Sequence, residues 1–192
     1  MGSDKRINIA IAGGPCTGKS TLAANLFSHL KNQDFDYDLI EEESRKLRKE
    51  FGNFRSPFER FYMWRQQERE ELRSTAVNGF ITDTCLYKYY TEARYYGSET
   101  RDALATRELF RMCTEVESKE RYNLIIMARD PLEIPYKKDS SRVSNPNSAL
   151  EKHRLMRTFL EHFCFNKLLF VNGNLDERLN QSMERILSLH FV

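Results

Sequence analysis

Short apolar runs alternate with amphipathic stretches along the whole chain. The runs predict five short strands, over 7–12, 35–41, 79–83, 122–128 and 167–171. Apolar residues at helical spacing predict a helix from the end of the first loop to about residue 31, and further helices over about 44–50, 56–76, 86–97, 100–118, 148–163 and 175–189. Strands that alternate with helices favour an α/β fold with a parallel sheet, helices on both faces and right-handed crossovers.

Two of the predicted helix starts carry a capping-box pattern. Ser56 stands three residues before Glu59, with Pro57 at the first helical position. Ser148 stands in the same way before Glu151. In a capping box the serine hydroxyl accepts from an amide of the first turn, and the glutamate accepts from the amide of the serine. We therefore expect helices to begin at Ser56 and Ser148.

The first strand runs into a glycine-bearing loop, Gly13-Gly14-Pro15-Cys16-Thr17-Gly18-Lys19-Ser20, followed by Thr21. This loop fits the phosphate-binding pattern G-x-x-x-x-G-K-[ST], between a strand and a helix as the pattern requires. The glycines let backbone amides approach phosphate oxygens, and the helix N-terminus attracts anions. Lys19 is placed to reach the β- and γ-phosphates, and the Ser20 hydroxyl to ligate Mg²⁺. The sequence therefore predicts nucleoside-triphosphate binding.

Polar residues follow the predicted strands at their carboxyl ends, where ligands bind in sheets of this kind. They are the glutamates at 41–43, Asp83, Arg129 with Asp130, and the turn 172–174. The stretch 129–147 is the longest one without periodicity, and loops of this length are usually functional or disordered. We expect these residues to line the site that the phosphate loop opens.

The composition is that of an ordinary globular chain. The 192 residues are 40% hydrophobic and 30% charged, which fits a single domain over 1–192. A formal net charge of +2 is too small to indicate nucleic-acid binding by itself. No apolar run approaches the roughly 20 residues that cross a bilayer, and no signal-peptide segment is recognised. We therefore expect a cytoplasmic protein with no membrane partner.

The four cysteines, Cys16, Cys85, Cys113 and Cys164, are scattered without the C-x-x-C spacing of a zinc site. They predict reduced thiols in a cytosolic protein rather than a disulfide framework. Cys16 lies in the phosphate loop near a helix N-terminus, a setting that favours the thiolate and its modification.

Several classes of phosphate-loop protein lack support in this sequence. A GTPase switch reads guanine with Asn-Lys-x-Asp, whereas the only Asn-Lys pair, Asn166-Lys167, enters a strand. The Leu-Ser-Gly-Gly signature of transporter ATPases is absent. Motor and unfoldase ATPases usually carry adjacent acids after a strand, but Thr84 follows Asp83. Small size, single acids at strand ends and a long basic loop late in the chain favour a kinase.

Motifs spread over nearly the whole chain carry a family resemblance. They are, in order, 11–21, Glu42 with Arg45, the aromatic and glutamine-rich helix 58–71, 81–83 with the aromatic helix through Gly97, the strand 124–127, and Asp139 with Arg142. In this order and spacing the chain resembles the P-loop kinases of the nicotinamide-riboside-kinase-like group, which has many bacteriophage members. The resemblance implies a three-layer P-loop kinase fold with a five-stranded parallel sheet in order 2-3-1-4-5. It also implies a lid over about 129–147.

The donor, ATP, is expected in the phosphate loop, with Lys19 on its phosphates. Arg129 is a further expected donor contact, and Asn172 is expected beside the adenine, although a plain strand-to-helix turn would look the same. Arg142 in the lid is expected to neutralise charge in the transition state. The alternative for Arg142 is a solvated charged loop.

Ser20 and Asp83 are the expected Mg²⁺ partners, and a helix N-cap before Thr84 is a second role open to Asp83. Many relatives have Asp-Arg where this chain has Asp83-Thr84, so an arginine that would touch the acceptor is missing. The class of acceptor is therefore open. The same broad group includes phage kinases that phosphorylate 5-hydroxymethyluracil already incorporated in DNA.

Glu42 is the expected general base for the acceptor hydroxyl. Glu41 and Glu43 remain open for this role, because the end of the strand is uncertain by a few residues. The structural alternative for Glu42 is an acid in the first turn of a helix, paired with Arg45.

Basic and aromatic residues interleave in the segment of about 42–76, which follows the second strand and is expected over the acceptor. Aromatic rings stack on bases and basic side chains hold phosphates, as for a base taken out of a stack. The alternative is an amphipathic helix with core aromatics and snorkelling arginines. The expected acceptor contacts are Arg45, Arg48, Phe58, Tyr62 and Arg65.

Three functional hypotheses follow. The first is an ATP- and Mg²⁺-dependent kinase for a hydroxyl of a nucleoside-like acceptor, with the hydroxymethyl group of hydroxymethyluracil in phage-type DNA as first choice, acting in the host cytoplasm if a phage encodes it. The second is a kinase for a free nucleoside, nicotinamide riboside or a (deoxy)nucleoside monophosphate. The third is a nucleotide-binding ATPase or regulatory module with no acceptor.

Overall fold

Five parallel strands form one sheet in the order β2-β3-β1-β4-β5. The computed structural model describes residues 5–52, 56–97, 100–131 and 145–191. The strands are β1 (Ile9–Ala12), β2 (Tyr37–Ile40), β3 (Gly79–Thr82), β4 (Leu124–Met127) and β5 (Leu168–Phe170). Each lies within its predicted apolar run, and the strand order confirms the predicted fold.

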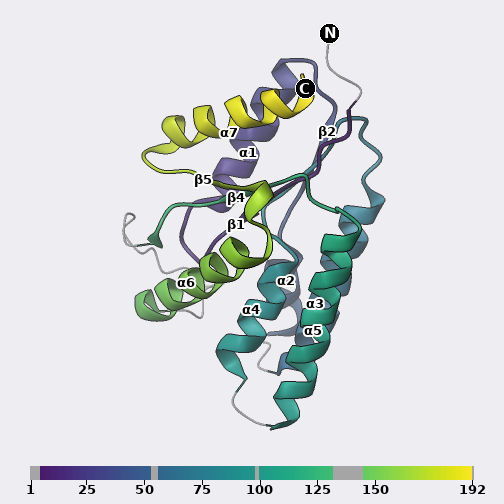
Figure 1. The fold of residues 1–192 in the computed structure, drawn as a ribbon, viewed down its shortest axis with the longest axis vertical. Helices are drawn as coiled ribbons and strands as arrows, with labels where there is room; N and C mark the ends of the chain where they lie inside the picture. Colours follow the sequence, from purple (N-terminus) through teal and green to yellow (C-terminus); the bar gives the residue numbers. More distant parts are fainter. Residues whose placement is uncertain (1–4, 53–55, 98–99, 132–144, 192) are drawn as a thin grey trace.

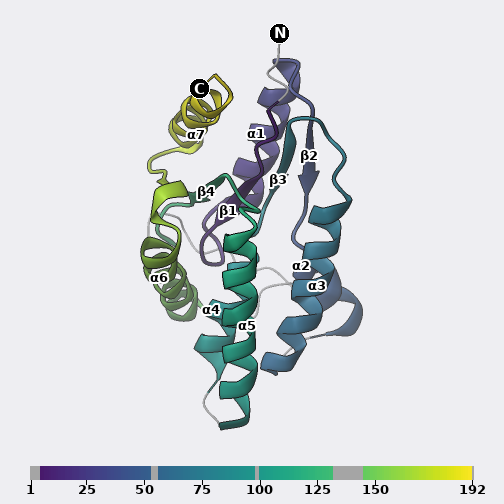
Figure 2. The same cartoon turned by 45° about the vertical axis from the view of Figure 1, so that its right-hand side comes forward.

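Helices cover both faces of this sheet (Figures 1 and 2). One face carries α1 (Lys19–Asn32) and α7 (Leu175–His190). The other carries α2 (Glu43–Phe51), α3 (Pro57–Arg73), α4 (Tyr87–Tyr96), α5 (Thr100–Ser118) and α6 (Pro146–Phe163). A short 3-10 turn, Phe165–Lys167, precedes β5. None of the described helices is long and apolar enough to cross a membrane.

The side chains of each strand divide between two cores, one on each face. Ala10 and Ala12 of β1 belong to the core under α2 to α6, whereas Ile9 and Ile11 belong to the core under α1 and α7. Successive side chains of a strand point to opposite faces. A strand covered on both faces therefore needs apolar residues at every position, which explains the continuous apolar runs in the sequence.

The helix starts confirm one of the two predicted capping boxes. In α3 the Phe58 amide donates to the Ser56 hydroxyl over 3.2 Å, and the Ser56 amide donates to the Glu59 carboxylate over 2.7 Å. The prediction for Ser148 is wrong: α6 begins two residues earlier. The side chain of Asn145 caps it by accepting from the Ser148 amide over 2.8 Å, with a proline at the first helical position.

A buried glutamine holds α3 in place beside two of the strand ends. The Gln67 side chain donates to the Thr82 hydroxyl over 3.0 Å and accepts from the Glu43 amide over 2.9 Å. Trp64, one turn before it, is buried against Tyr89 of α4. The tryptophan of the predicted acceptor segment is therefore a core residue, and α3 is fixed relative to the ends of β2 and β3.

Candidate active site

The phosphate loop joins β1 to α1 and packs tightly against α6. A side chain on Gly14 would place its Cβ 2.7 Å from the Ala149 carbonyl oxygen, so only glycine fits there. Gly18 has φ of 78°, in the left-handed region that glycine adopts without strain. These two positions give a physical reason for the glycines of the motif.

The Lys19 side chain folds back over its own loop. Its ammonium donates to the Gly14 carbonyl oxygen over 2.7 Å. Burial lowers the pKa of Lys19 to about 8, while the nearby carboxylates of Glu42 and Asp83 oppose this effect. Lys19 therefore lies among the residues that were predicted to act with it, and the negative charge of a phosphate would stabilise the ammonium that burial disfavours.

His153 of α6 contacts the loop from the other side. Its Nδ1 atom accepts from the Gly14 amide over 3.3 Å, and burial lowers the pKa of the ring to about 4. The ring is therefore neutral at physiological pH. No motif in the sequence includes His153, because the contact joins residues 139 positions apart.

Arg178 of α7 supports the loop near Gly18. Its guanidinium donates to the Thr17 carbonyl oxygen over 3.5 Å and to the Asn174 carbonyl oxygen over 3.2 Å. The Thr17 hydroxyl in turn donates to the Gly14 carbonyl oxygen over 3.0 Å. Cys16, with φ of 64°, is half-exposed and forms no disulfide with the other described cysteines.

Ser20 and Asp83 face each other where α1 begins and β3 ends. The Ser20 side chain hydrogen-bonds to the Asp83 carboxylate, and burial raises the pKa of Asp83. The Oδ1 atom of Asp83 is buried without a hydrogen-bond partner among the described residues. The N-cap alternative for Asp83 does not hold, because α4 begins at Tyr87 with Leu86 before it.

A hydroxyl beside an unsatisfied carboxylate oxygen fits a magnesium ion, which prefers oxygen ligands and keeps several waters. The part of the chain that the structure describes holds no cluster of three or more His, Cys, Asp or Glu side chains able to bind a metal. Ser20 and Asp83 would therefore hold the ion together with donor phosphates and water, as is usual for Mg²⁺.

The three successive glutamates after β2 lie in different surroundings. The Glu41 side chain is 71% exposed and lies 3.6 Å from Lys46, and Glu43 pairs with the same lysine over 2.8 Å. Glu42 is only 9% exposed. It is therefore the most buried of the three, although the Glu43 side chain is also only 15% exposed.

Glu42 contacts Lys88 of α4 and the Ser44 hydroxyl. Burial by itself would raise the pKa of Glu42, but the positive charges of Lys88 and Lys19 hold it far below its ordinary value. The carboxylate is therefore ionised at all physiological pH values. Lys88 lies in the predicted aromatic helix, five positions after Asp83, but no pattern in the sequence marks it as a partner of Glu42.

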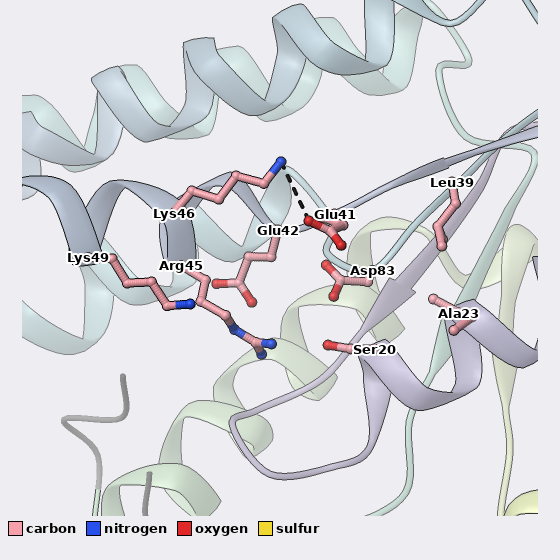
Figure 3. A pocket seen from close by; sticks show the side chains of 10 residues that line it. Ser20, Ala23, Leu39, Glu41, Glu42, Arg45, Lys46, Lys49 and Asp83 are labelled. Carbon is pink, nitrogen blue, oxygen red and sulfur yellow. Dashed lines mark ion pairs between the residues drawn. The ribbon is translucent and has the colours of Figure 1, made fainter. Parts of the chain in front are cut away.

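A pocket of about 300 Å³ opens beside these groups, between α1, the end of β2 and α2 (Figure 3). Ser20, Glu42 and Asp83 form its inner end, and the cationic side chains of α2 form its outer rim. The lining residues are Ser20, Ala23, Ala24, Leu39, Glu41, Glu42, Arg45, Lys46, Lys49 and Asp83. The pocket thus has an acidic floor and a basic rim.

The other expected donor contacts lie at the ends of β4 and β5. The Arg129 guanidinium donates to the Gly173 carbonyl oxygen over 3.1 Å, which ties these two ends together. Asn172 is exposed, and the Gln181 side chain bridges its backbone amide and carbonyl. Arg142 and the central part of the expected lid lie outside the described residues.

The expected acceptor contacts separate into three groups. Arg45 lines the pocket, and Arg48 lies 3.9 Å from Glu92 of α4. Phe58 and Tyr62 are half-exposed on α3. Arg65 pairs with Glu68 over 2.7 Å beside α5 and does not line the pocket.

Comparison with known proteins agrees with this fold. A family model described as an AAA domain matches residues 8–178. No curated protein sequence gives a significant match. Among solved structures, NadR in complex with NAD and AMP-PNP is similar, with a TM-score of 0.71, 18% identity, and coverage of 97% of this chain and 50% of that one.

Two further structures are similar. NadR in complex with NR has a TM-score of 0.68 at 17% identity, over 97% of this chain and 52% of that one. Deoxyadenosine kinase from M. mycoides with bound dCTP has a TM-score of 0.66 at 14% identity, over 95% of this chain and 100% of that one. The chain spans about half the length of the NadR chains, and at these identities the likeness shows the fold. The family match covers most of the chain, and the protein belongs to this AAA domain family.

Proposed function

We propose that the protein is an ATP-dependent phosphotransferase that moves the γ-phosphate to a hydroxyl of a nucleoside-like acceptor. One observation carries this proposal. The ends of β1, β2 and β3 bring the phosphate loop, Glu42 and Asp83 around one pocket. A donor site, a metal-compatible pair and a buried carboxylate at one sheet edge are the parts that phosphoryl transfer needs.

The donor side follows from the loop. Its amides and Lys19 hold the phosphates, while Ser20 and Asp83 hold Mg²⁺. When bound, the ion would neutralise part of the negative charge of the phosphates. Arg129 is assigned to the donor and Asn172 to its adenine, and Arg142, outside the described residues, is assigned to the charge of the transition state. The last of these roles rests on the family resemblance.

Glu42 is the general base in this proposal. The acceptor oxygen attacks the γ-phosphorus, the bond to the bridging oxygen of ADP breaks, and the acceptor proton passes to the Glu42 carboxylate. A base with a very low pKa accepts a proton poorly, and Lys88 is the main nearby charge that lowers the pKa of Glu42. We therefore expect Lys88 to shift away from Glu42 when the acceptor binds.

The first choice of acceptor is the hydroxymethyl group of 5-hydroxymethyluracil in DNA. The basic rim of the pocket, with Arg45, Lys46 and Lys49, supports it, because a DNA strand carries a phosphate at each nucleotide. The exposed rings of Phe58 and Tyr62 offer stacking surfaces on the same segment.

The second candidate is a kinase for a free nucleoside, nicotinamide riboside or a nucleoside monophosphate. The similar structures favour it, since one is described as NadR in complex with NR and another as a deoxyadenosine kinase. The third candidate, an ATPase without an acceptor, is consistent with the description of the family as an AAA domain. Asp83 argues against this candidate, because it is a single acid followed by Thr84, whereas motor and unfoldase ATPases usually carry adjacent acids there.

An acceptor screen with γ-labelled ATP and Mg²⁺ separates the three. The panel contains an oligonucleotide with hydroxymethyluracil, the same oligonucleotide with thymine, the free nucleosides, nicotinamide riboside and the deoxynucleoside monophosphates. Label on the hydroxymethyluracil strand alone supports the first choice. Label on a free nucleoside or mononucleotide alone selects the second candidate. Label released only as inorganic phosphate selects the third.

A further inference from the structure

A second charged cluster lies next to Glu42 and shares Lys88 with it. Its centre is Glu92 of α4, which is buried. The Nη2 atom of Arg48, the Nε atom of Arg60 and the Nζ atom of Lys88 lie 3.9, 3.5 and 3.9 Å from its carboxylate oxygens. We call Arg48, Arg60, Lys88 and Glu92 the Glu92 cluster; it joins α2, α3 and α4.

The contacts inside the Glu92 cluster are longer than hydrogen bonds. The Arg60 Nε atom and the Glu92 Oε2 atom are both buried without a hydrogen-bond partner among the described residues. Arg60 is only 2% exposed, and its guanidinium donates to the Met63 sulfur and lies over the Tyr96 ring. Buried charged groups with unused hydrogen-bonding capacity are costly. The cluster therefore has hydrogen-bonding groups that a purely structural ion pair would be expected to satisfy.

The cluster carries more positive than negative charge. Arg48, Arg60 and Lys88 face Glu92 and Glu42, and Lys88 is shared between the two carboxylates. The surrounding cations hold the pKa of Glu92 below its ordinary value although burial opposes them, so Glu92 is ionised. Lys152 adds a further positive charge near Glu92, and Lys19 adds one near Glu42, so positive charge is in excess around the two carboxylates. A bound anion would offset this excess.

Phosphate oxygens match these donors best. Two guanidinium groups present planar arrays of N–H donors that fit phosphate, and an ammonium adds a point charge. Lys88 contacts Glu42 directly, so an anion held by the cluster would lie beside the candidate base. We therefore expect this anion to be a group of the acceptor rather than of the ATP donor.

We propose that the Glu92 cluster binds a phosphate group that the acceptor already carries. The inference rests on the proposed function and narrows its acceptor to phosphate esters, either mononucleotides or nucleotides within a strand. Arg48 and Arg60 hold the phosphate, and Lys88 turns from Glu42 towards it. The same movement frees Glu42 to take the proton of the hydroxyl.

Equilibrium binding tests this, with a non-hydrolysable ATP analogue present so that the phosphate loop is filled. The probes are 5-hydroxymethyl-2′-deoxyuridine, its 5′-monophosphate and a short oligonucleotide that contains it. We expect the phosphate-bearing probes to bind at least tenfold more tightly than the nucleoside. The mononucleotide and the oligonucleotide distinguish the two sources of phosphate, and the tighter of the two identifies the acceptor.

Arg48→Gln and Arg60→Gln should remove that preference, so that the nucleoside and its phosphate bind about equally. Arg48 is 24% exposed in its side chain, so its variant is expected to fold even if the Arg60 variant does not. Arg121→Gln is the matched control, because Arg121 is 12% exposed and lies 3.6 and 3.9 Å from Glu68 and Glu71, outside the cluster. It should leave the preference intact.

Equal binding of the nucleoside and its phosphate by the wild-type protein, or no binding of any probe, would overturn the proposal. An unchanged preference in Arg48→Gln would also overturn it. Because binding is measured without transfer, the two proposals fail separately. A phosphate-dependent preference without phosphorylation of any acceptor would contradict the proposed kinase and leave the binding site standing.

Discussion

The ammonium group of Lys88 lies against the buried carboxylate of Glu42, although 46 positions separate them in the chain. The contact links the first turn of α4 to the end of β2 and sets the charge of the candidate base. Lys88 also lies 3.9 Å from Glu92, so one side chain connects the candidate base to the proposed phosphate site.

Lys88→Met should destabilise the fold by about 3 kcal/mol, because it leaves Glu42 buried without its main partner. Urea unfolding at pH 7.5 measures the loss. The double variant Lys88→Met/Glu42→Gln should recover most of it, since the unpaired charge is then gone. Equal losses in the single and double variants would show that packing, not charge, dominates at this position.

Lys19→Ala should lower phosphoryl transfer by at least about 10³-fold, because a cation that contacts the transferring phosphate is removed. Steady-state transfer from labelled ATP measures the effect. Lys31→Ala, at the exposed far end of the same helix, is the control and should retain normal rates. Comparable rates in the two variants would exclude Lys19 from the donor site.

Asp83→Asn should raise the Mg²⁺ concentration needed for half-maximal activity by about tenfold or more. The amide keeps the shape of the side chain but loses the charge that attracts the ion. Magnesium titration of the transfer rate checks this. Asp38→Asn is the control, because this carboxylate instead accepts from the backbone amides of Thr75 and Ala76. An unchanged magnesium requirement in Asp83→Asn would contradict the metal assignment.

His153 should make the fold sensitive to mild acid. Its pKa is about 4 in the folded protein and 6.5 unperturbed, so the unfolded state takes up a proton first as the pH falls. Stability is therefore complete above about pH 6.5 and falls between there and pH 4. The wild-type protein should lose about 2 kcal/mol more than His153→Gln between pH 7.5 and pH 5. Parallel losses in the two proteins would show that the ring is not held neutral.

Local patterns in the sequence were enough to locate the five strands and the phosphate loop. Residues that are adjacent in the chain are enough to recognise each strand run, the phosphate loop and Asp83. The order of the strands in the sheet followed from the family resemblance. The N-cap of α6 was misplaced by three residues because Asn145 and Ser148 are both good caps, and only the backbone decides between them.

The contacts and burial of Glu42 could not be predicted from the sequence. Three glutamates in a row offer the same chemistry, and the exposure of each depends on how β2 enters α2. Lys88, Arg60 and Glu92 lie on helices that were interpreted as aromatic. Their contacts join separate elements, so no spacing along the chain reveals them.

The central claim is that Glu42 takes the proton of an acceptor hydroxyl while the phosphate loop delivers the γ-phosphate. Transfer of labelled γ-phosphate to the acceptor panel by wild-type protein, Glu42→Ala and Glu41→Ala tests it most directly. We expect label on a nucleoside-like hydroxyl with wild type and Glu41→Ala, and a loss of about 10²–10⁴-fold in Glu42→Ala with ATP affinity largely kept. Near-normal turnover by Glu42→Ala, or label released only as inorganic phosphate by the wild-type protein, would contradict it.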